Sequence, residues 1–316
     1  MFALVIDDGA LAWRERPDPI PGAGDVVVEV AAAGLNAADL LQRRGLYPAP
    51  PGVPADVPGL ELAGRVAAVG EGVDGSWVGR KVAALTGGGA QATHCAVPLE
   101  HLLEVPEGVS LLEAGGFPEA FCTAHDALVT QAALVEGERL LVTGAAGGVG
   151  CAAVQIGRAL GASVVALTRD PRHDEALRTL GADEVVGVDD LARTESVDVV
   201  LELVGAATLP TALRRVRPRG RVVVVGVGSG ARVELDLLAV MGSRLTLTGS
   251  TLRSRTRAEK ADVVARVAHD LGPRWRNGEL RVPIAEVVDA REAARAYDLF
   301  ARPGKFGKIV LAVGPT

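Results

Sequence analysis

The stretch that decides the fold runs from residue 138 to residue 150: Glu138-Arg139-Leu140-Leu141-Val142-Thr143-Gly144-Ala145-Ala146-Gly147-Gly148-Val149-Gly150. An apolar strand runs into glycines at a spacing of three, and a helical segment follows. Gly144 lets the chain leave the strand, Gly147 lets backbone approach an anion, and Gly150 is expected to let the helix pack against the sheet. The free N–H groups of the helix would face a diphosphate. The stretch therefore predicts a dinucleotide-binding turn, whose expected cofactor contacts are Gly144, Ala146, Gly147, Gly148, Val149 and Gly150.

The segment around this turn, residues 119–256, alternates strands with helices. Its strands are continuously apolar, which is typical of a parallel sheet with helices on both faces. Two of the expected helices span residues 120–133 and 207–216. The pattern predicts an α/β domain with a Rossmann-type, doubly wound parallel sheet.

Residues 1–118 read differently, as short strands separated by Gly and Pro. Strands are expected at 26–30, 62–69 and 80–85, and few helices fit. The segment 257–316 is too short to fold alone, so its last strand, 307–313, is expected to complete the first module. The first domain is therefore predicted as an all-β or barrel-like module.

Composition narrows the class of protein. The chain has 316 residues, 48% of them hydrophobic, and a net charge of −6. That length suits two domains, and the negative charge gives no reason to expect nucleic acid or an anionic membrane as a partner. Three cysteines without a Cys-x-x-Cys pair suit a reducing compartment, and no apolar stretch is long enough for a membrane span. We expect a cytoplasmic protein.

The end of the next strand, Ser163 to Leu167, bears on the choice of nucleotide. It is followed by Thr168 and Arg169, and a guanidinium can donate two parallel hydrogen bonds to a 2′-phosphate. Asp170 could be read as the carboxylate that binds ribose, but Pro171 follows it, which favours a helix N-cap. NADPH is therefore preferred over NADH, with a solvated surface charge as the alternative for Arg169.

Several motifs in order resemble the medium-chain dehydrogenase/reductase superfamily, in its zinc-free, zeta-crystallin-like quinone oxidoreductase branch. Asn36 to Asp39 resembles the family's Asn-x-x-Asp segment, and Gly45 to Pro48 resembles its Gly-x-Tyr-Pro segment. Pro58 to Gly64 resembles its Pro-Gly-x-Glu-x-x-Gly segment, and Gly307 to Leu311 its closing strand. The resemblance implies that the first domain is a GroES-like β-barrel catalytic domain.

Zinc-dependent relatives carry Cys where Asn36 stands and His where Leu60 stands, and their third ligand would fall near Glu119. An amide and an isobutyl group are not competent zinc ligands. We therefore expect no metal. Without a metal ion, the alkoxide that forms during alcohol oxidation lacks its usual stabilisation. The resemblance implies instead a metal-independent, NADPH-dependent reductase of quinones or α,β-unsaturated carbonyls.

Two residues are expected to act at the acceptor. The NH₂ of Asn36 could donate to the substrate oxygen near the nicotinamide ribose, although an Asn in a turn after a strand is an alternative. Tyr47 could line the acceptor pocket, or simply pack in its loop. His125 replaces the family's large aromatic residue and could be a packing residue or a proton donor.

Further cofactor contacts are implied by the resemblance or by position after strands of the sheet. They are Asn36, Thr123, Val204, Gly226, Val227, Ser250, Thr251 and Lys305. Two other functions stay open: an enoyl-thioester reductase for acyl-CoA or acyl-carrier substrates, for which Arg43 and Arg44 are the only basic candidates, and a non-catalytic NADPH-binding protein. A homodimer is expected through the apolar segment 233–248.

Overall fold

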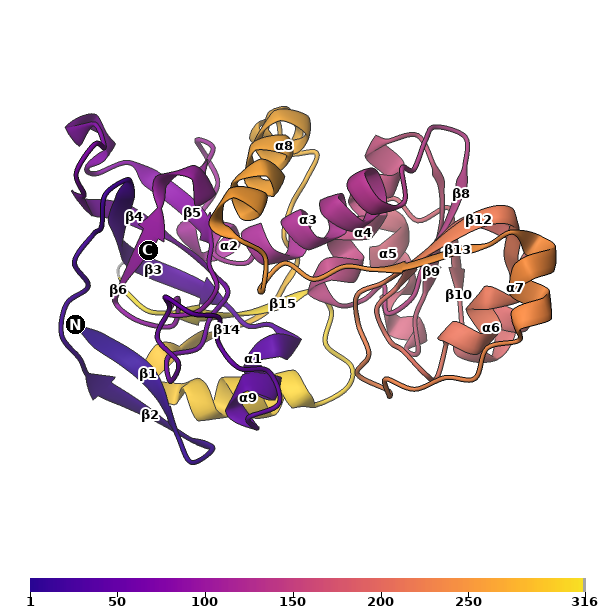
Figure 1. Cartoon of the computed structure of the whole chain (residues 1–316), viewed down its shortest axis with the longest axis horizontal. Coiled ribbons are helices and arrows are strands. Elements are labelled where there is room, and N and C mark those ends of the chain that lie inside the picture. Colours follow the sequence, from indigo (N-terminus) through magenta and orange to yellow (C-terminus); the bar gives the residue numbers. More distant parts are fainter. Residues whose placement is uncertain (315–316) are drawn as a thin grey trace. The chain divides into compact units, whose positions relative to one another are not determined.

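The computed structural model describes residues 1–314, which form two compact units (Figure 1). Unit 1 contains Met1–Cys122 and the chain from Leu252 onward, and unit 2 contains Thr123–Thr251. The boundaries predicted from sequence, after residues 118 and 256, lie a few residues from these. Each unit is built around its own β-sheet.

Unit 2 is built on a six-stranded parallel sheet of the order β10-β9-β8-β11-β12-β13. Its strands are β8 (Arg139–Val142), β9 (Ser163–Leu167), β10 (Glu184–Val186), β11 (Val197–Glu202), β12 (Val216–Val224) and β13 (Thr246–Gly249). Its helical segments are η3 (Asp126–Gln131), α4 (Gly148–Ala159), η4 (Pro171–His173), α5 (Asp174–Leu180), η5 (Val188–Arg193), α6 (Leu209–Leu213) and α7 (Leu237–Ser243). The predicted doubly wound parallel sheet is confirmed.

The centre of this sheet is apolar on both faces. Leu140, Leu141 and Val142 of β8 are fully buried, as are the residues of β11 that pair with them. Because β8 lies between β9 and β11, the strand order changes direction at β8, and ligands of such sheets bind beyond the carboxyl ends of the strands at this point. The glycine turn that follows β8 is therefore at the expected place.

Two glycines bring α4 close to its neighbours. A Cβ on Gly157 would lie 2.8 Å from Leu140 and 2.9 Å from Val164, so this glycine lets the helix approach the sheet. A Cβ on Gly150 would lie 2.5 Å from the Gly144 carbonyl oxygen, which is in the turn. The prediction that Gly150 lets the helix pack against the sheet was therefore wrong. Gly150 lets α4 pack against the turn, and Gly157 lets it pack against the sheet.

Two predicted helices differ from those observed. The helix expected over 120–133 is an α-helix, α3 (Pro118–His125), followed by the π-helical η3, in which the N–H of Ala132 donates to the Ala127 carbonyl five residues before it. The helix expected over 207–216 is shortened to α6, because Val216 already belongs to β12.

Unit 1 contains a seven-stranded sheet with the path β14-β15-β3-β4-β5-β7, in which β6 pairs with β3, and a separate β1-β2 pair. The strands are β1 (Phe2–Asp7), β2 (Ala10–Glu15), β3 (Asp25–Gly34), β4 (Glu61–Val69), β5 (Lys81–Leu85), β6 (His94–Pro98), β7 (Leu102–Glu104), β14 (Ile284–Asp289) and β15 (Lys308–Ala312). The helical segments are α1 (Ala37–Arg43), η1 (Gly75–Trp77), η2 (Leu99–His101), α2 (Leu111–Ala114), α3, which crosses the boundary after Cys122, α8 (Arg257–Arg276), η6 (Ala290–Glu292) and α9 (Ala293–Ala301).

The C-terminal part of the chain completes this unit. β15 pairs antiparallel with β3, and Val310, Leu311 and Ala312 lie opposite Gly34, Ala33 and Ala32. The pairing of β3 with β15 thereby brings residues from the N-terminal and C-terminal parts of the chain next to each other. Within residues 1–314, no helix has both the length and the apolar composition that a membrane span requires.

Candidate active site

The glycine turn of unit 2 has the backbone that anion binding needs. Gly144 adopts φ +61°, a conformation that favours glycine, and Gly147 is the N-cap of α4 with no side chain capping the helix. The first N–H groups of α4 precede the first i to i−4 bond, which is donated by Cys151 to Gly147, so they point out of the helix end. These features fit a diphosphate.

A buried carboxylate holds the neighbouring loop at the end of β11. One oxygen of Glu202 accepts hydrogen bonds from the Thr143 hydroxyl at 2.8 Å, the Thr208 hydroxyl at 2.9 Å, and the N–H groups of Val204 at 2.7 Å and Gly205 at 2.8 Å. This carboxylate therefore joins the ends of β8 and β11. Val204 is one of the predicted cofactor contacts, and its backbone is fixed from behind by Glu202.

A pocket of about 500 Å³ lies beyond the end of β9, and Thr168 and Arg169 are among the residues that line it. The Asp170 carboxylate accepts from the N–H of Arg172, with Pro171 at the first helical position, so the predicted cap is confirmed. The Arg172 guanidinium pairs with the same carboxylate at 2.6 Å, whereas the exposed Arg169 guanidinium has no partner within the described chain. Arg169 is therefore the guanidinium available to a ligand here.

Thr123 offers an unused hydroxyl. Its side chain is buried, and Oγ1 has no hydrogen-bond partner among residues 1–314. A buried polar atom without a partner is uncommon in proteins and indicates a site for a ligand or water. Thr123, the glycine turn and Arg169 are all in unit 2, and their chemistry fits a phosphorylated dinucleotide.

The other predicted cofactor residues of unit 2 follow strands of the sheet. The Gly226 N–H donates to the Glu202 carbonyl at 3.1 Å, and Val227 is exposed after it. The Ser250 hydroxyl donates to Asp126 at 2.7 Å, and Thr251 is the last residue of the unit. These positions are beyond the carboxyl ends of β12 and β13.

Lys305 of unit 1 takes part in local contacts. Its ammonium donates to the Phe300 carbonyl at 2.9 Å and lies 4.2 Å from the centre of the Phe300 ring. The lysine thereby satisfies a carbonyl near the end of α9. Its predicted contact with a cofactor stays a prediction.

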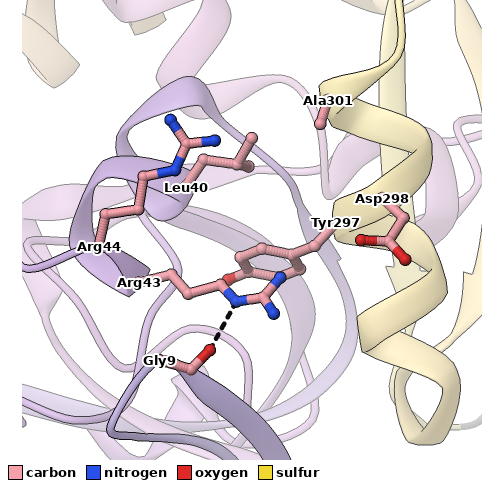
Figure 2. A pocket seen from close by; sticks show the side chains of 7 residues that line it. All are labelled: Gly9, Leu40, Arg43, Arg44, Tyr297, Asp298 and Ala301. Carbon is pink, nitrogen blue, oxygen red and sulfur yellow. Dashed lines mark hydrogen bonds between the residues drawn. The ribbon is translucent and has the colours of Figure 1, made fainter.

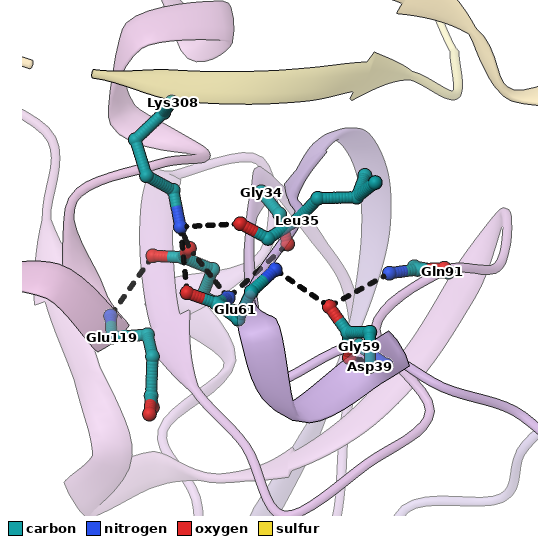
Figure 3. A network of polar contacts seen from close by, with 9 residues as sticks. Gly34, Leu35, Asp39, Gly59, Glu61, Gln91, Glu119 and Lys308 are labelled. Carbon is teal, nitrogen blue, oxygen red and sulfur yellow. Dashed lines mark hydrogen bonds and ion pairs between the residues drawn. The ribbon is translucent and has the colours of Figure 1, made fainter. Parts of the chain in front are cut away.

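A buried polar network surrounds Asn36 in unit 1, and Figure 3 labels its other members, among them Glu61, Lys308 and Asp39. The Lys308 ammonium donates to the Asn36 side-chain oxygen at 2.7 Å and to the Leu35 carbonyl at 2.8 Å, and it also pairs with Glu61. The Asn36 NH₂ donates to the same Glu61 oxygen at 2.9 Å. Lys308 and Glu61 therefore fix which side of the Asn36 amide is the oxygen and which is the nitrogen.

The backbone of Asn36 is held by Asp39. The Asn36 N–H donates to the Asp39 carboxylate at 2.8 Å, and Asp39 also accepts from Gln91, whose side-chain oxygen accepts from the Tyr297 hydroxyl at 2.9 Å. Burial raises the pKa of Asp39 to about 6, and the hydrogen bond from Asn36 opposes that rise. Asn36 is both the N-cap of α1 and the centre of this network.

Tyr47 is stacked beneath an arginine in the same unit. The Arg253 guanidinium lies 5.0 Å from the centre of the Tyr47 ring and donates to the Tyr47 carbonyl at 2.8 Å. Arg253 also donates to Gln42 and to the Gly87 carbonyl. The loop that carries Tyr47 is thereby held in one place by a buried arginine.

The residues at the positions of zinc ligands do not fit zinc. Asn36 offers an amide already bonded to Glu61 and Lys308, and Leu60 offers no donor atom. Over the described part of the chain, no three His, Cys, Asp or Glu side chains are gathered closely enough to hold a metal ion. The groups around Asn36 therefore do not form a set of zinc ligands.

Another pocket, of about 530 Å³, is in unit 1, and Arg43, Arg44 and Asp298 are among the residues that line it (Figure 2). Arg43 lies over the Tyr297 ring, 5.9 Å from its centre, and donates through Nε to the Gly9 carbonyl. Arg44 is exposed and has no partner within residues 1–314. The pocket therefore presents a guanidinium that an anion could use.

The ion pair between Glu61 and Lys308 was not predicted from the sequence. The two residues are 247 positions apart. Glu61 was quoted only as part of the Pro58 to Gly64 family motif, and Lys308 only as part of the closing strand. A charged residue at the start of an apolar strand was the available signal. In the fold, both side chains are almost completely buried.

Comparisons with known proteins agree with this architecture. Residues 22–132 match the family described as alcohol dehydrogenase GroES-like domain, and residues 148–269 match the family described as zinc-binding dehydrogenase. The quinone oxidoreductase of Pseudomonas aeruginosa is 34% identical over 322 residues, which cover 98% of each chain. A polyketide synthase of Streptomyces halstedii is 34% identical over 313 residues, which cover 96% of this chain and 5% of the synthase.

A solved structure adds a nucleotide to the comparison. A mycobacterial protein in complex with NADPH superposes with a TM-score of 0.86 at 26% identity, covering 99% of this chain and 100% of the other. Together with the sheet order, the glycine turn and the two relatives, this establishes the family predicted from the sequence motifs. The chain belongs to the medium-chain dehydrogenase/reductase superfamily, in its zeta-crystallin-like quinone oxidoreductase branch.

Proposed function

We propose that this protein is a metal-independent, NADPH-dependent reductase of quinones or α,β-unsaturated carbonyls. The observation that carries the proposal is the network around Asn36, in which the metal-ligand positions are filled by an amide and an isobutyl group and the amide is oriented by Lys308 and Glu61. Such an arrangement supplies a fixed hydrogen-bond donor where relatives would supply a Lewis acid.

The residues of this chain then orient the acceptor and stabilise the negative charge that develops on its oxygen. When bound, NADPH supplies the hydride, and the protein supplies position and electrostatics. The Asn36 NH₂ donates to Glu61 at 2.9 Å and makes a long bond, of 3.4 Å, to the Gly34 carbonyl; an acceptor oxygen would take the place of this long bond. Tyr47, held by Arg253, can pack against the acceptor ring. Both roles are proposals that rest on the family resemblance.

NADPH is proposed over NADH because of Arg169. This guanidinium lines the pocket at the end of β9 and has no partner in the described chain, while Arg172 is occupied by Asp170. A 2′-phosphate would accept charge-assisted hydrogen bonds from it. The phosphate end of the cofactor would contact the glycine turn, and Thr123 would offer its free hydroxyl.

A second candidate function is the reduction of enoyl thioesters. The pocket that brings Arg43 and Arg44 together could take the phosphate of a coenzyme A or carrier-bound acyl group. The match to a segment of a polyketide synthase favours the same substrate class. Enoyl-CoA turnover faster than quinone turnover, and its loss in Arg44→Ala, would favour this function.

We also propose a homodimer formed through α7 and β13. β13 is at the edge of the parallel sheet, and the exposed fractions of Leu237, Leu238 and Met241 on α7 are 68%, 78% and 71%. An apolar patch beside an open strand edge indicates a protein interface. Light scattering is expected to give a dimer for the wild type and a monomer for Leu238→Glu/Met241→Glu, while Ile20→Glu, at an exposed isoleucine of unit 1, stays dimeric.

The experiment that tests the enzymatic proposal is an acceptor panel. The purified, chelator-dialysed protein is mixed with NADPH and a quinone, an enone or an enoyl thioester, and the loss of NADPH absorbance is followed. Turnover with a quinone or enone supports the proposal. A requirement for added zinc would overturn the metal-independent mechanism, and NADPH binding without turnover of any acceptor would favour a non-catalytic role.

A further inference from the structure

Two ionisable side chains of unit 1 lie in its interior without a hydrogen bond or ion pair among residues 1–314. The Glu119 carboxyl group and the Lys260 ammonium make no hydrogen bond or ion pair to any residue within the described chain, although Lys260 is only 7% exposed and Glu119 is partly buried. Burial of an ionisable group without a partner costs free energy. Such groups concentrate at functional sites, and neither has a role in the hydride transfer proposed for this protein.

Glu119 is attached to the same carboxylate as Asn36. The Glu119 N–H donates to one oxygen of Glu61 at 2.9 Å, and the Asn36 NH₂ donates to the other oxygen at 2.9 Å. Figure 3 shows the Glu119 side chain extending away from the Lys308–Glu61 contact. The Glu119 backbone is therefore bonded to the same carboxylate as the Asn36 amide, while the Glu119 carboxyl group takes no part in the hydrogen bonds that hold Asn36.

The elements that carry Glu119 and Lys260 are packed against each other. Phe117, next to the start of α3, stacks on Trp275 of α8 with ring centres 3.9 Å apart, and on Phe121 of α3 with ring centres 4.0 Å apart. Lys260 is on the same helix as Trp275, and its ammonium lies beside Gly87. The aromatic stack therefore fixes the acid and the cation in one region of unit 1.

The surroundings favour a protonated Glu119 at neutral pH. Burial and then the negative charge of Glu61 raise its pKa to about 8, with Asp39 adding to the rise, while Lys308 and Lys260 oppose it. These groups face Glu119 from β4, α1, β15 and α8. Burial lowers the pKa of Lys260, and the charge of Glu119 opposes that change.

We propose that Glu119 donates the proton that completes reduction of the acceptor, and that Lys260 stabilises the carboxylate left behind. This inference rests on the proposed reductase function. Hydride from NADPH brings two electrons to the quinone or enone and leaves an oxyanion. The O–H bond of Glu119 breaks as an O–H bond forms on that oxygen, the electron pair stays on the carboxylate, and a solvent proton restores the acid.

The test compares three variants with the wild type. In Glu119→Gln, kcat with a quinone is expected to fall about 10²-fold, because the amide cannot donate a carboxyl proton. Wild-type activity is expected to fall above pH 8 as Glu119 ionises, and this fall is absent in Glu119→Gln. In Lys260→Met the fall moves to higher pH, since a cation that favours the carboxylate is gone. The exposed Glu107→Gln should resemble the wild type.

An independent readout uses the protein without cofactor or substrate. Infrared spectra at pH 7 should contain a protonated carboxyl band that disappears near pH 8 and is missing in Glu119→Gln. Absence of that band from the wild type, or equal kcat and pH profiles for wild type and Glu119→Gln, overturns the inference. If the wild type reduces no acceptor, the proposed function fails too. An active wild type with an unaffected Glu119→Gln refutes only this inference. Lys260→Met keeps the test available if Glu119→Gln does not fold.

Discussion

Removal of the Lys308 ammonium is the perturbation that bears most directly on the site. Lys308 is 3% exposed and Glu61 is 0% exposed, so Lys308→Met leaves a carboxylate in the interior without its cation. The same change removes the donor to the Asn36 oxygen, 2.7 Å away, and leaves the amide held only through its NH₂ group. We expect a loss of stability together with a loss of activity.

The expected size of the stability change depends on the remaining contacts. Breaking a buried ion pair from one side costs about 3–5 kcal/mol, because the remaining charge is uncompensated. Glu61 keeps two hydrogen bonds, from the Asn36 NH₂ and the Glu119 N–H, so we expect the lower end of this range. Lys308→Met/Glu61→Gln removes both charges and should regain more than half of the loss.

Urea unfolding followed by tryptophan fluorescence is the assay. The chain has three tryptophans, Trp13, Trp77 and Trp275, and all of them are in unit 1 together with the mutated pair. The signal therefore reports the unit that contains Lys308. Lys81→Met is the matched control, because Lys81 also begins a strand but is exposed and has no side-chain partner within residues 1–314.

Two results would refute this reasoning. The first is a change of less than about 1 kcal/mol in Lys308→Met, the size expected for an exposed pair. The second is a double variant whose loss equals the sum of the two single losses, since independent side chains would not form the coupled pair described here.

Three further predictions concern other parts of the molecule. Because the pKa of Glu119 is raised from 4.5 to about 8, the folded state holds its proton more tightly than the unfolded state, and wild-type stability should fall between these pH values. Thermal melts at pH 9 should therefore find Glu119→Gln more stable than the wild type by about 2–3 kcal/mol, a value reduced for the partial exposure of Glu119. The assignment would be contradicted if the difference in stability between the two proteins were the same at pH 5 and at pH 9. In Gly150→Ala the new Cβ would be 2.5 Å from the Gly144 oxygen, so the Kd for NADPH, measured by fluorescence, should rise at least about tenfold. The helical Gly272→Ala, whose Cβ would meet no atom within 4 Å, should bind normally. Arg169→Ala should raise the KM for NADPH about 10- to 100-fold, as expected for a lost charged hydrogen bond, without affecting the KM for NADH; equal effects on the two cofactors would remove Arg169 from the site.

Local sequence patterns were sufficient for much of unit 2. Continuous apolar strands correctly predicted a parallel sheet, and the Asp170-Pro171 pair correctly predicted a cap. These features depend on neighbouring residues and on burial, both of which leave a periodic signal. The role of Gly150 was misassigned, because its close neighbour in the fold is the turn and the sequence does not show distances.

The environment of Asn36 could not be predicted in the same way. Asp39 is only three residues away, so its contact with the Asn36 N–H is local in the sequence. Lys308, by contrast, reaches Asn36 only because β15 pairs with β3, across 272 positions of the sequence. A tertiary contact of this kind leaves no local pattern, so the sequence showed neither the Glu61–Lys308 pair nor the environment of the Glu119 carboxyl group.

The central claim is that a metal-independent site transfers hydride from NADPH to a quinone or enone. The most direct measurement is the steady-state rate of quinone reduction by chelator-dialysed protein, with NADPH and NADH compared at equal concentrations. The account predicts turnover that is insensitive to the chelator and a kcat/KM at least about tenfold higher for NADPH, equivalent to about 1.4 kcal/mol. Equal values for the two cofactors, or activity that appears only after zinc is added, would contradict it.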